Sequence, residues 1–545
     1  MMMTGWSCSN GGGDQVSPPP PPPSTFSFTD LTVNGSLKGF THYGVNTTPS
    51  LKMSFSDKVD RNTVATATTF STKSGTAVPV TVTYENGDSA IIIRPAAALS
   101  YLTAYQVTVG GSLKSSSSKV LQAPVSLALT TEIDAKDKFP QVSDEELLTL
   151  VQKRTFRYFW DLAHPVSGLA LERNTSGETV TSGGSGFGIM AIIVGVERGF
   201  ITRTEGQARM QKITNFLRNA ERFHGAFPHW LNGTTGKAIP FGEKDNGADL
   251  VETAYLVQGL LAARQYFKGT DVTETAIRDN INAICSAVEW NWFRKNNENV
   301  LYWHWSPNYN WDMNMPIKGW SECLITYILA AANGPYTVPA AVYTSGWARN
   351  GAMKNNNDYF GLKLPLGPAF GGPLFFSHYS FLGVNPNGLT DQYADYKTQV
   401  VNHAKINYAH CVANPSGFYG YGPNCWGLTA SDIPNGYAAS SPTNDIGVIA
   451  PTAALASFPY TPDASMSALK FFYYKLGDRI WKDYGFTDAF SLKDVWFADS
   501  HIAIDQGPII IMIENYRSGL LWNLLMSSPE IKSGLHNLGF VSPYI

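Results

Sequence analysis

The sequence predicts a two-domain protein, with an N-terminal all-β sandwich followed by an all-α (α/α)6 toroid. Residues 24–133 contain short alternating or β-branched runs separated by turn residues, the pattern of antiparallel strands. From residue 140 to residue 545 the apolar residues instead recur with the helical period of 3.6. These helical segments alternate between nearly uncharged and charge-bearing ones, as buried inner helices and exposed outer helices do.

The composition excludes several classes of partner. The chain has 545 residues with 40 Lys+Arg against 43 Asp+Glu, a net charge of -3, so it lacks the basic field that nucleic acid or an anionic bilayer requires. Only 15% of the residues are charged, whereas 13% are aromatic. No run of about 18 apolar residues occurs, so we expect no membrane-spanning helix.

Residues 1–23 are low in complexity, and their proline run favours an extended tether. Within them, Cys8 in the segment SCSN resembles the acylated cysteine of a bacterial lipoprotein. That interpretation requires an apolar signal upstream of Met1, and the alternative is an ordinary cysteine in a tail. We expect a periplasmic or cell-surface protein whose contact with a membrane is a lipid on Cys8.

The five cysteines lack the C-x-x-C spacing of a zinc site. Cys411 and Cys425 are close enough in sequence for a disulfide, and free buried thiols explain them equally well. The sequence leaves these two alternatives open.

The predicted strands of the first domain occur at short, regular intervals, which is typical of a sandwich. They comprise residues 51–55, 78–84, 90–94 and 105–109, with a turn at 85–88. The segments FSDKVDRNTV and IIIRPAAALSYLTAYQVTV resemble bacterial immunoglobulin-like modules found beside surface enzymes. Because no acidic or histidine cluster occurs here, we expect a structural module.

The predicted helices of the second domain alternate in charge along the chain. They comprise residues 144–163, 186–200, 206–223, 247–267, 274–290, 321–332, 392–412, 447–458, 464–481 and 507–526, with short helices near 338–347 and at the C-terminus. In such a toroid the loops that lead into the inner helices line one end, where function concentrates.

Two of these loops, residues 299–320 and 367–383, are long and aromatic. Aromatic faces mixed with Asn, Asp and His suit sugar rings, whose C–H faces stack while their hydroxyl groups need hydrogen bonds. Core packing accounts for many of the aromatic residues. It does not explain four tryptophans in one polar loop, Trp303, Trp305, Trp311 and Trp320.

The candidate catalytic groups are carboxylates, because no serine-nucleophile elbow, H-E-x-x-H motif or phosphate loop occurs. Cleavage of a glycosidic bond needs a carboxylic acid to protonate the leaving oxygen and a carboxylate to act on water or attack. Asp245, Asp249 and Glu252 are spaced i, i+4 and i+7, which on a helix places them on one stripe. Their alternative role is to complement a helix dipole.

Glu322 follows the tryptophan-rich loop, in the first turn of a predicted apolar helix. Burial beside aromatic walls raises the pKa of a carboxyl group into the range of a general acid. The alternative is a first-turn capping residue. Asp505 and Asp445 are equally explained as N-caps, and Glu514 as a partner of Arg517.

Long segments in the second domain resemble the glucoamylase-like bacterial proteins of glycoside hydrolase family 144. The resemblance covers nearly all of residues 140–545 and implies an (α/α)6 barrel that hydrolyses β-1,2-glucan by inversion, without a metal. It implies that Glu322 is the proton donor and that Asp245, Asp249, Glu252 and Asp505 are functional acids, with the base open because a water relay is possible. The segments include HWLNG, DLVETAYLVQGLLAARQYF, YWHWSP, GWSECLITYILAA, GGPLFFSHYSFLG, FYGYGPNCWGLTASD, APTAALASFPYTP and IDQGPIIIMIENYRSGLLW.

These observations lead to a defined set of site residues, with no cofactor and no metal expected. The predicted catalytic residues are Glu322, Asp505, Asp249 and Glu252. The predicted substrate-binding residues are Asp245, Phe187, His229, Trp230, Trp303, Trp305, Trp320, His378, Tyr379, Trp426, Asp445 and Glu514. We expect a monomer whose partner is a β-linked glucan.

Alternatives remain for the activity. The enzyme could cut internally or release sophorose from a chain end, and the long loops slightly favour chain-end release because they could close the cleft. Another (α/α)6 enzyme, such as a glucoamylase or a polysaccharide lyase, is the first alternative, although a lyase would need basic residues that the aromatic loops lack. A non-catalytic surface protein that binds glycans is the second.

Overall fold

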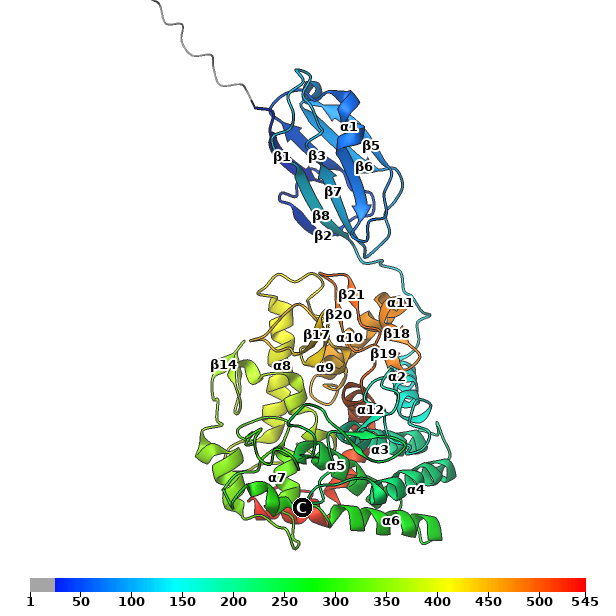
Figure 1. The fold of residues 1–545 in the computed structure, drawn as a ribbon, viewed down its shortest axis with the longest axis vertical. Coiled ribbons are helices and arrows are strands. Elements are labelled where there is room, and N and C mark those ends of the chain that lie inside the picture. Colours follow the sequence, from blue (N-terminus) through cyan, green and yellow to red (C-terminus); the bar gives the residue numbers. More distant parts are fainter. Residues whose placement is uncertain (1–24) are drawn as a thin grey trace, which may run out of the picture. The chain divides into compact units, whose positions relative to one another are not determined.

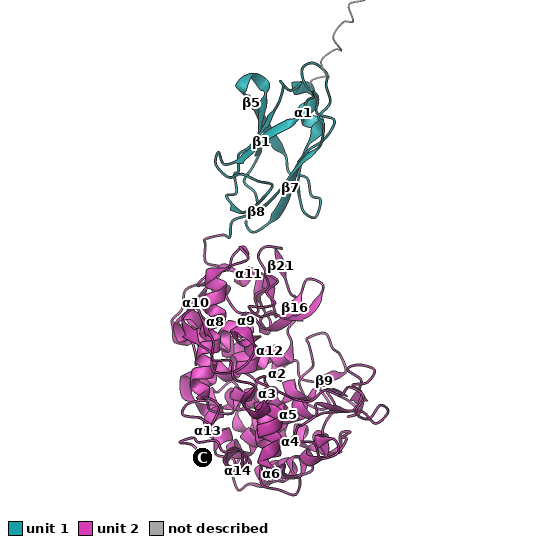
Figure 2. Ribbon diagram, turned by 90° about the vertical axis from the view of Figure 1, so that its left-hand side faces the viewer, with its two compact units in different colours: residues 1–133 teal, residues 134–545 magenta. Residues whose placement is uncertain are grey.

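The computed structural model describes residues 25–545, and it divides the chain into two compact units, Met1–Ile133 and Asp134–Ile545 (Figures 1 and 2). Residues 1–24, and with them the tether and Cys8, lie outside the described residues. The first unit is built from strands and the second mainly from helices. The all-β and all-α character expected of the two parts of the chain is therefore confirmed.

Among the described residues of the first unit, eight strands and one short α-helix form its framework. They are β1 Phe28–Val33, β2 Thr41–Val45, β3 Leu51–Phe55, α1 Arg61–Ala67, β4 Thr68–Thr72, β5 Val80–Glu85, β6 Ala90–Pro95, β7 Ala104–Val109 and β8 Val125–Thr131. One sheet has the order β1-β3-β6-β5 and the other β2-β8-β7-β4, with β2 and β8 parallel. Alternate residues of β3 and β7 are buried in one hydrophobic core, which makes the unit a sandwich.

The helices of the second unit are of two kinds. Those buried along nearly all their residues are α3 Ser182–Glu197, α5 Leu250–Tyr266, α7 Leu324–Ala330, α9 Pro451–Leu455 and α12 Ala503–Ser518. Those that bury part of their surface are α2 Asp144–Trp160, α4 Arg203–Asn219, α6 Val272–Cys285, α8 Tyr396–Ala413, α10 Pro462–Lys470, α13 Leu520–Met526 and α14 Pro529–Asn537. Buried and half-exposed helices alternate along the chain, as in a toroid.

Between α7 and α9 the chain forms short helical turns in addition to one long helix, α8. A π-helical turn at Val342–Trp347 and two buried 3₁₀ turns, Leu374–Ser377 and Ser380–Leu382, occupy this part of the chain together with α8. Proline and glycine residues, such as Pro373 and Gly372, keep this segment from forming a longer helix. The aromatic loop at 367–383 is therefore a packed segment of short turns.

Helix α3 packs closely against α5 because its glycine-rich start lacks side chains. A β-carbon on Gly186 would overlap the backbone carbonyl of Tyr255, and one on Gly259 would overlap Gly186. The run GGSGFG thus lies inside the first turns of α3, where it permits close helix contact.

Three helix boundaries differ from the predicted ones. The predicted helix at 507–526 is two helices, because Gly519 adopts a left-handed conformation with φ 69° and ends α12. The helix after Glu322 begins only at Leu324, and the one after Asp445 begins only at Pro451. Glu322 therefore lies in the turn before α7.

The structure also tests the expectations about disulfide bonds and membrane-spanning helices. Cys411 and Cys425 are buried free thiols, so the disulfide alternative is wrong. Among residues 25–545, no helix combines the length and apolar character needed to cross a membrane.

Candidate active site

A central pocket of about 500 Å³ brings together carboxylates and aromatic rings from distant parts of the second unit. Two of its acids, Glu252 and Glu322, are predicted catalytic residues, and the third is Glu172. The aromatic residues that line it are Trp230, Phe241, Tyr255, Trp303, Phe375, Tyr379 and Tyr437. Stacking faces and hydrogen-bonding acids in one cavity are what a sugar-binding site requires.

Glu322 is held in the turn before α7 with its carboxyl group in the pocket. Its backbone carbonyl accepts a hydrogen bond from the Ser380 hydroxyl group, which fixes the turn. Burial raises the pKa of Glu322 to about 7, and the negative charges of Glu252 and Asp249 contribute in the same direction. At neutral pH a large fraction of this carboxyl group therefore carries a proton that it can donate.

Glu252 lies in the first turn of α5 and bridges to the start of α3. Its Oε2 accepts a hydrogen bond of 2.7 Å from the backbone N–H of Gly183. A β-carbon on Gly183 would collide with this carboxylate, so the glycine makes the contact possible. Burial raises the pKa of Glu252, as does the nearby charge of Asp249, while the positive charge of His229 opposes the shift.

Asp249 is the N-cap of α5 and is fully buried. Its Oδ1 accepts hydrogen bonds from the backbone N–H groups of Val251, at 3.0 Å, and Glu252, at 2.9 Å. Its Oδ2 accepts one of 3.0 Å from Nδ1 of His229. Burial alone would raise the pKa of Asp249, but the His229 hydrogen bond and the charge of His304 lower it below its usual value.

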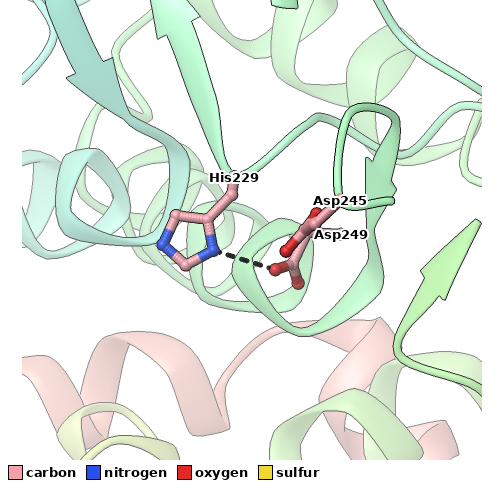
Figure 3. A group of neighbouring side chains, drawn as sticks. All are labelled: His229, Asp245 and Asp249. Atoms are coloured by element: carbon pink, nitrogen blue, oxygen red, sulfur yellow. Dashed lines mark hydrogen bonds and ion pairs between the residues drawn. The ribbon is translucent and has the colours of Figure 1, made fainter. Parts of the chain in front are cut away.

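His229, Asp245 and Asp249 converge in Figure 3, although they do not form one stripe of a helix. The predicted i, i+4, i+7 stripe is wrong because Asp245 and Asp249 precede α5. Instead the loop before α5 folds back, and Oδ1 of Asp245 lies 3.3 Å from Nδ1 of His304. These residues line a second cavity, of about 580 Å³, which shares His229, Phe241 and Trp303 with the central pocket.

The same three side chains could hold a metal ion, because their donor atoms lie within 4.8 Å of one another. Their charge state favours hydrogen bonding instead. Burial opposes a charge on His229, but Glu252 and Asp249 raise its pKa to about 9. A protonated imidazole is not a metal ligand, so a cation at this position would have to displace the proton of His229.

Asp505 lies in the first turn of α12 but is not its N-cap, which is Ile502. It is buried, shares a hydrogen bond with the carboxyl group of Asp488, and does not line the central pocket, although its neighbour Ile504 does. Burial and the charge of Asp488 raise the pKa of Asp505 far above its usual range, and that of Asp488 rises to about 7. The two carboxyl groups therefore share a proton directly behind the pocket wall.

An ion cluster that the sequence did not predict lies beside this pair. Nε of Arg173 lies 3.0 Å from Oε2 of Glu172, and Nη1 of Arg173 lies 3.2 Å from Oδ2 of Asp432. The backbone N–H of Asp432 donates a hydrogen bond of 2.6 Å to Oδ2 of Asp488. Because Asp432 lies about 260 residues from Arg173 in the chain, no local sequence pattern reveals this cluster.

The predicted substrate-binding residues fall into three groups. Asp245, His229, Trp230, Trp303 and Tyr379 line the two cavities described above. Their contact with substrate stays a prediction, which this position supports.

Four other predicted substrate-binding residues are packed in the interior and line neither cavity, so their contact with substrate stays a prediction without support from their position. Phe187 packs beneath the pocket against Tyr255 and Tyr379. Trp320 packs against Phe381 and Tyr396. Nε2 of His378 lies 3.0 Å from the Ser457 hydroxyl group. Trp426 is buried, and its Nε1 donates a hydrogen bond to the carbonyl oxygen of Ala464. In each case the large side chain fills the core between helices.

Three further residues are used by protein contacts outside the cavities. Trp305 packs against Phe223, His224 and Trp292. Glu514 forms an ion pair of 2.7 Å with Arg198, not with Arg517. Asp445 accepts hydrogen bonds of 2.9 Å from His410 and from the Tyr421 hydroxyl group, and it caps no helix because α9 starts at Pro451. These three residues line neither described cavity, and their contact with substrate stays a prediction.

Comparison with known families agrees with the two units. A bacterial Ig-like domain model matches residues 29–131, and the Glycoamylase family model, which describes glucoamylases, matches residues 314–529.

Individual relatives are similar over longer stretches. The chain is 52% identical to a solved structure of an endo-β-1,2-glucanase from Chitinophaga pinensis in complex with sophorotriose and glucose. The TM-score of this match is 0.73. That match covers 74% of this chain and 100% of the other. A β-1,2-glucanase structure from Parabacteroides distasonis is 40% identical with a TM-score of 0.71, covering 95% of this chain and 74% of the other.

A curated relative from Parabacteroides distasonis, an exo β-1,2-glucooligosaccharide sophorohydrolase acting at the non-reducing end, is 48% identical over 420 residues. The match covers 73% of this chain and 58% of the relative, so the chain spans less than two thirds of that protein's length.

A helical toroid with an acid-lined, aromatic pocket is the architecture of (α/α)6 proteins that act on glycans. Within that class the chain belongs to glycoside hydrolase family 144, and it carries a bacterial immunoglobulin-like module at its N-terminal side.

Proposed function

We propose that this protein is an inverting glycoside hydrolase that cleaves β-1,2-glucan and releases sophorose or short β-1,2-glucooligosaccharides. The observation that carries the proposal is the Glu322 carboxyl group, whose pKa of about 7 lies in the range of a general acid and which shares an aromatic pocket with Glu252. The substrate follows from the relatives, which are described as β-1,2-glucanases and as a sophorohydrolase.

In the proposed reaction the bond between C1 of one glucose unit and the O2 oxygen of the next is broken. Glu322 gives its proton to that oxygen, so the leaving sugar departs as an alcohol. A water molecule attacks C1 from the opposite face and loses a proton to a carboxylate. Glu252 could accept the proton directly, and Asp505 could accept it only through a relay because it lies behind the pocket wall.

The walls of the pocket support a neutral sugar as the ligand. Trp230, Trp303 and Tyr379 offer aromatic faces to the C–H faces of glucose. The carboxylates of Glu172 and Glu252 offer acceptors to hydroxyl groups.

The alternative activities have less support. A polysaccharide lyase would bind uronic acids, but the arginine of the central pocket, Arg173, is already paired with Glu172 and Asp432. The remaining acids of the pocket would repel a uronate. A non-catalytic glycan-binding protein has no need of a buried carboxyl group with a raised pKa, and burying one costs stability.

We also propose that the protein acts as a monomer in the periplasm or at the cell surface, attached through a lipid on Cys8. The support is the SCSN segment followed by the proline-rich tether. Expression of the full-length gene with and without Cys8→Ala, followed by membrane fractionation, tests the anchor. Equal recovery of both forms from the soluble fraction would contradict it.

A panel of linear glucans tests the activity. We expect products from β-1,2-glucan and none from β-1,3-, β-1,4- or α-1,4-glucan. Proton NMR of the first products should show the α-anomer, because inversion at a β-linkage gives α. Initial release of the β-anomer would contradict inversion and would require a nucleophile near Glu322.

A further inference from the structure

A further cavity of about 690 Å³, which we call the Trp496 cavity, lies beside the central pocket. Arg173 and Tyr437 line both spaces, so the two cavities adjoin each other at these side chains. Its other walls include Asn174, Asp432, Trp496 and Ser500. None of these six residues is among the predicted site residues.

The Trp496 cavity is built on short, well-connected elements. Asp432 and Tyr437 are paired across a hairpin of strands β16 Ala430–Ile433 and β17 Gly436–Ala439. Trp496 belongs to strand β21 Trp496–Phe497, which pairs with β20 Phe490–Ser491. The adjacent ring of Phe497 stacks on Phe490, and this contact anchors β21 on the toroid.

The polar groups of the cavity are held in place by hydrogen bonds. Asp432 accepts hydrogen bonds from Arg173 and from the Ser500 hydroxyl group, and its backbone N–H donates to Asp488. The amide oxygen of Asn174 accepts a hydrogen bond of 2.9 Å from the backbone N–H of His501. A ligand therefore meets groups that are already oriented, which lowers the entropic cost of binding.

We propose that the Trp496 cavity binds additional glucose units of the glucan chain as it leaves the central pocket. This inference rests on the proposed function and extends it from the bond that is cleaved to the length of chain that is recognised. It predicts that the enzyme prefers oligosaccharides long enough to reach Trp496.

The charge of the cavity favours a neutral sugar over an anion. The guanidinium group of Arg173 faces the carboxylates of both Glu172 and Asp432, so no positive charge is left uncompensated. An anionic ligand would be repelled by these acids. Glucose offers hydroxyl groups to Asp432 and a C–H face to the rings of Trp496 and Tyr437.

A series of β-1,2-glucooligosaccharides of increasing length tests the proposal. We expect kcat/KM of the wild type to rise with length, and we expect Trp496→Ala to lower kcat/KM for long oligosaccharides at least about fivefold more than for the shortest cleaved one. Trp496→Phe keeps a ring and should recover much of the difference. Tyr437→Ala provides a contrast, because Tyr437 also lines the central pocket and its loss should lower kcat/KM for every length of substrate.

Trp292→Ala is the matched control, because Trp292 is 41% exposed and packs against His224 outside the described cavities. It should leave the ratio between long and short substrates unchanged. An equal loss on all lengths in Trp496→Ala, or no loss on any length, would overturn the proposal. Absence of any β-1,2-glucan cleavage by the wild type would instead overturn the proposed function.

Discussion

Nδ1 of His229 lies 3.0 Å from Oδ2 of Asp249, while Oδ1 of the same carboxylate caps helix α5. One buried side chain thus fixes the start of the helix that carries Glu252 and holds a histidine that lines the central pocket. Since Asp249 is fully buried and does not line the central pocket, it acts through these neighbours. We therefore treat Asp249 as a positioning residue.

Asp249→Asn separates the charge of this residue from its capping role. Asparagine can still cap the helix through its amide oxygen, but the variant breaks the buried pair with His229, so we expect thermal stability near neutral pH to fall. Loss of the charge should lower the pKa of His229 from about 9 towards its ordinary 6.5 and reduce kcat/KM at least about tenfold. NMR titration of His229 and steady-state kinetics measure the two effects. A His229 pKa still near 9 together with activity within threefold of wild type would contradict this role.

Glu252→Gln and Asp505→Asn test which acid handles the proton of the attacking water. An amide keeps the shape of the side chain but accepts no proton, so the residue that acts on water should lose kcat by about 10²-fold or more. A residue that only holds sugar hydroxyl groups should mainly raise KM. If both variants kept kcat and KM within about threefold of wild type, neither acid would belong to the catalytic machinery.

The pH profile of kcat/KM should have an alkaline limb near pH 7. Glu322 must be protonated to act as the acid, and its pKa is about 7, so the active fraction falls as pH rises through that value. Above the limb the rate should fall about tenfold per pH unit. An alkaline limb that starts only above about pH 9 would show that another group donates the proton.

The stability of Glu322→Gln relative to wild type should also depend on pH. The folded protein binds the Glu322 proton more tightly than the unfolded chain, so this contribution to stability is present below the ordinary pKa of 4.5 and is lost as pH rises through about 7. The variant has no such titration. Between pH 4.5 and about 7, the free energy of unfolding of the variant minus that of the wild type should therefore rise by up to about 3 kcal/mol. Above about pH 7 this difference should stay constant. Denaturant unfolding at several pH values measures the difference, and a gap that does not change with pH would contradict the raised pKa.

The sequence predicted the fold class because strand and helix patterns are local. The alternation along residues 51–55 became β3, and the apolar run after Asp249 became the buried helix α5. Helix starts were predicted less well. Asp445 and Asp505 are both followed by apolar residues, yet neither is an N-cap, because tertiary hydrogen bonds or pairing use their carboxyl groups.

The site was predicted only in part, because only some of its residues stand out in the local sequence. Glu322 and Glu252 stand out as charges in apolar segments, and the structure places both in the central pocket. The cluster of Glu172, Arg173 and Asp432 joins segments about 260 residues apart, which no local pattern reveals. Conversely, Trp320 and Trp426 look like binding residues in sequence but fill the core, since an aromatic ring serves either purpose.

The central claim is that Glu322 protonates the glycosidic oxygen of β-1,2-glucan, and the rate of product release by Glu322→Gln tests it most directly. Linear β-1,2-glucan is incubated with wild type and with the folded variant, and sophorose and longer oligosaccharides are quantified over time. We expect the variant to lose about 10²- to 10⁴-fold in kcat while it still binds the oligosaccharides. Retention of more than about a tenth of the wild-type kcat by the folded variant would contradict the claim.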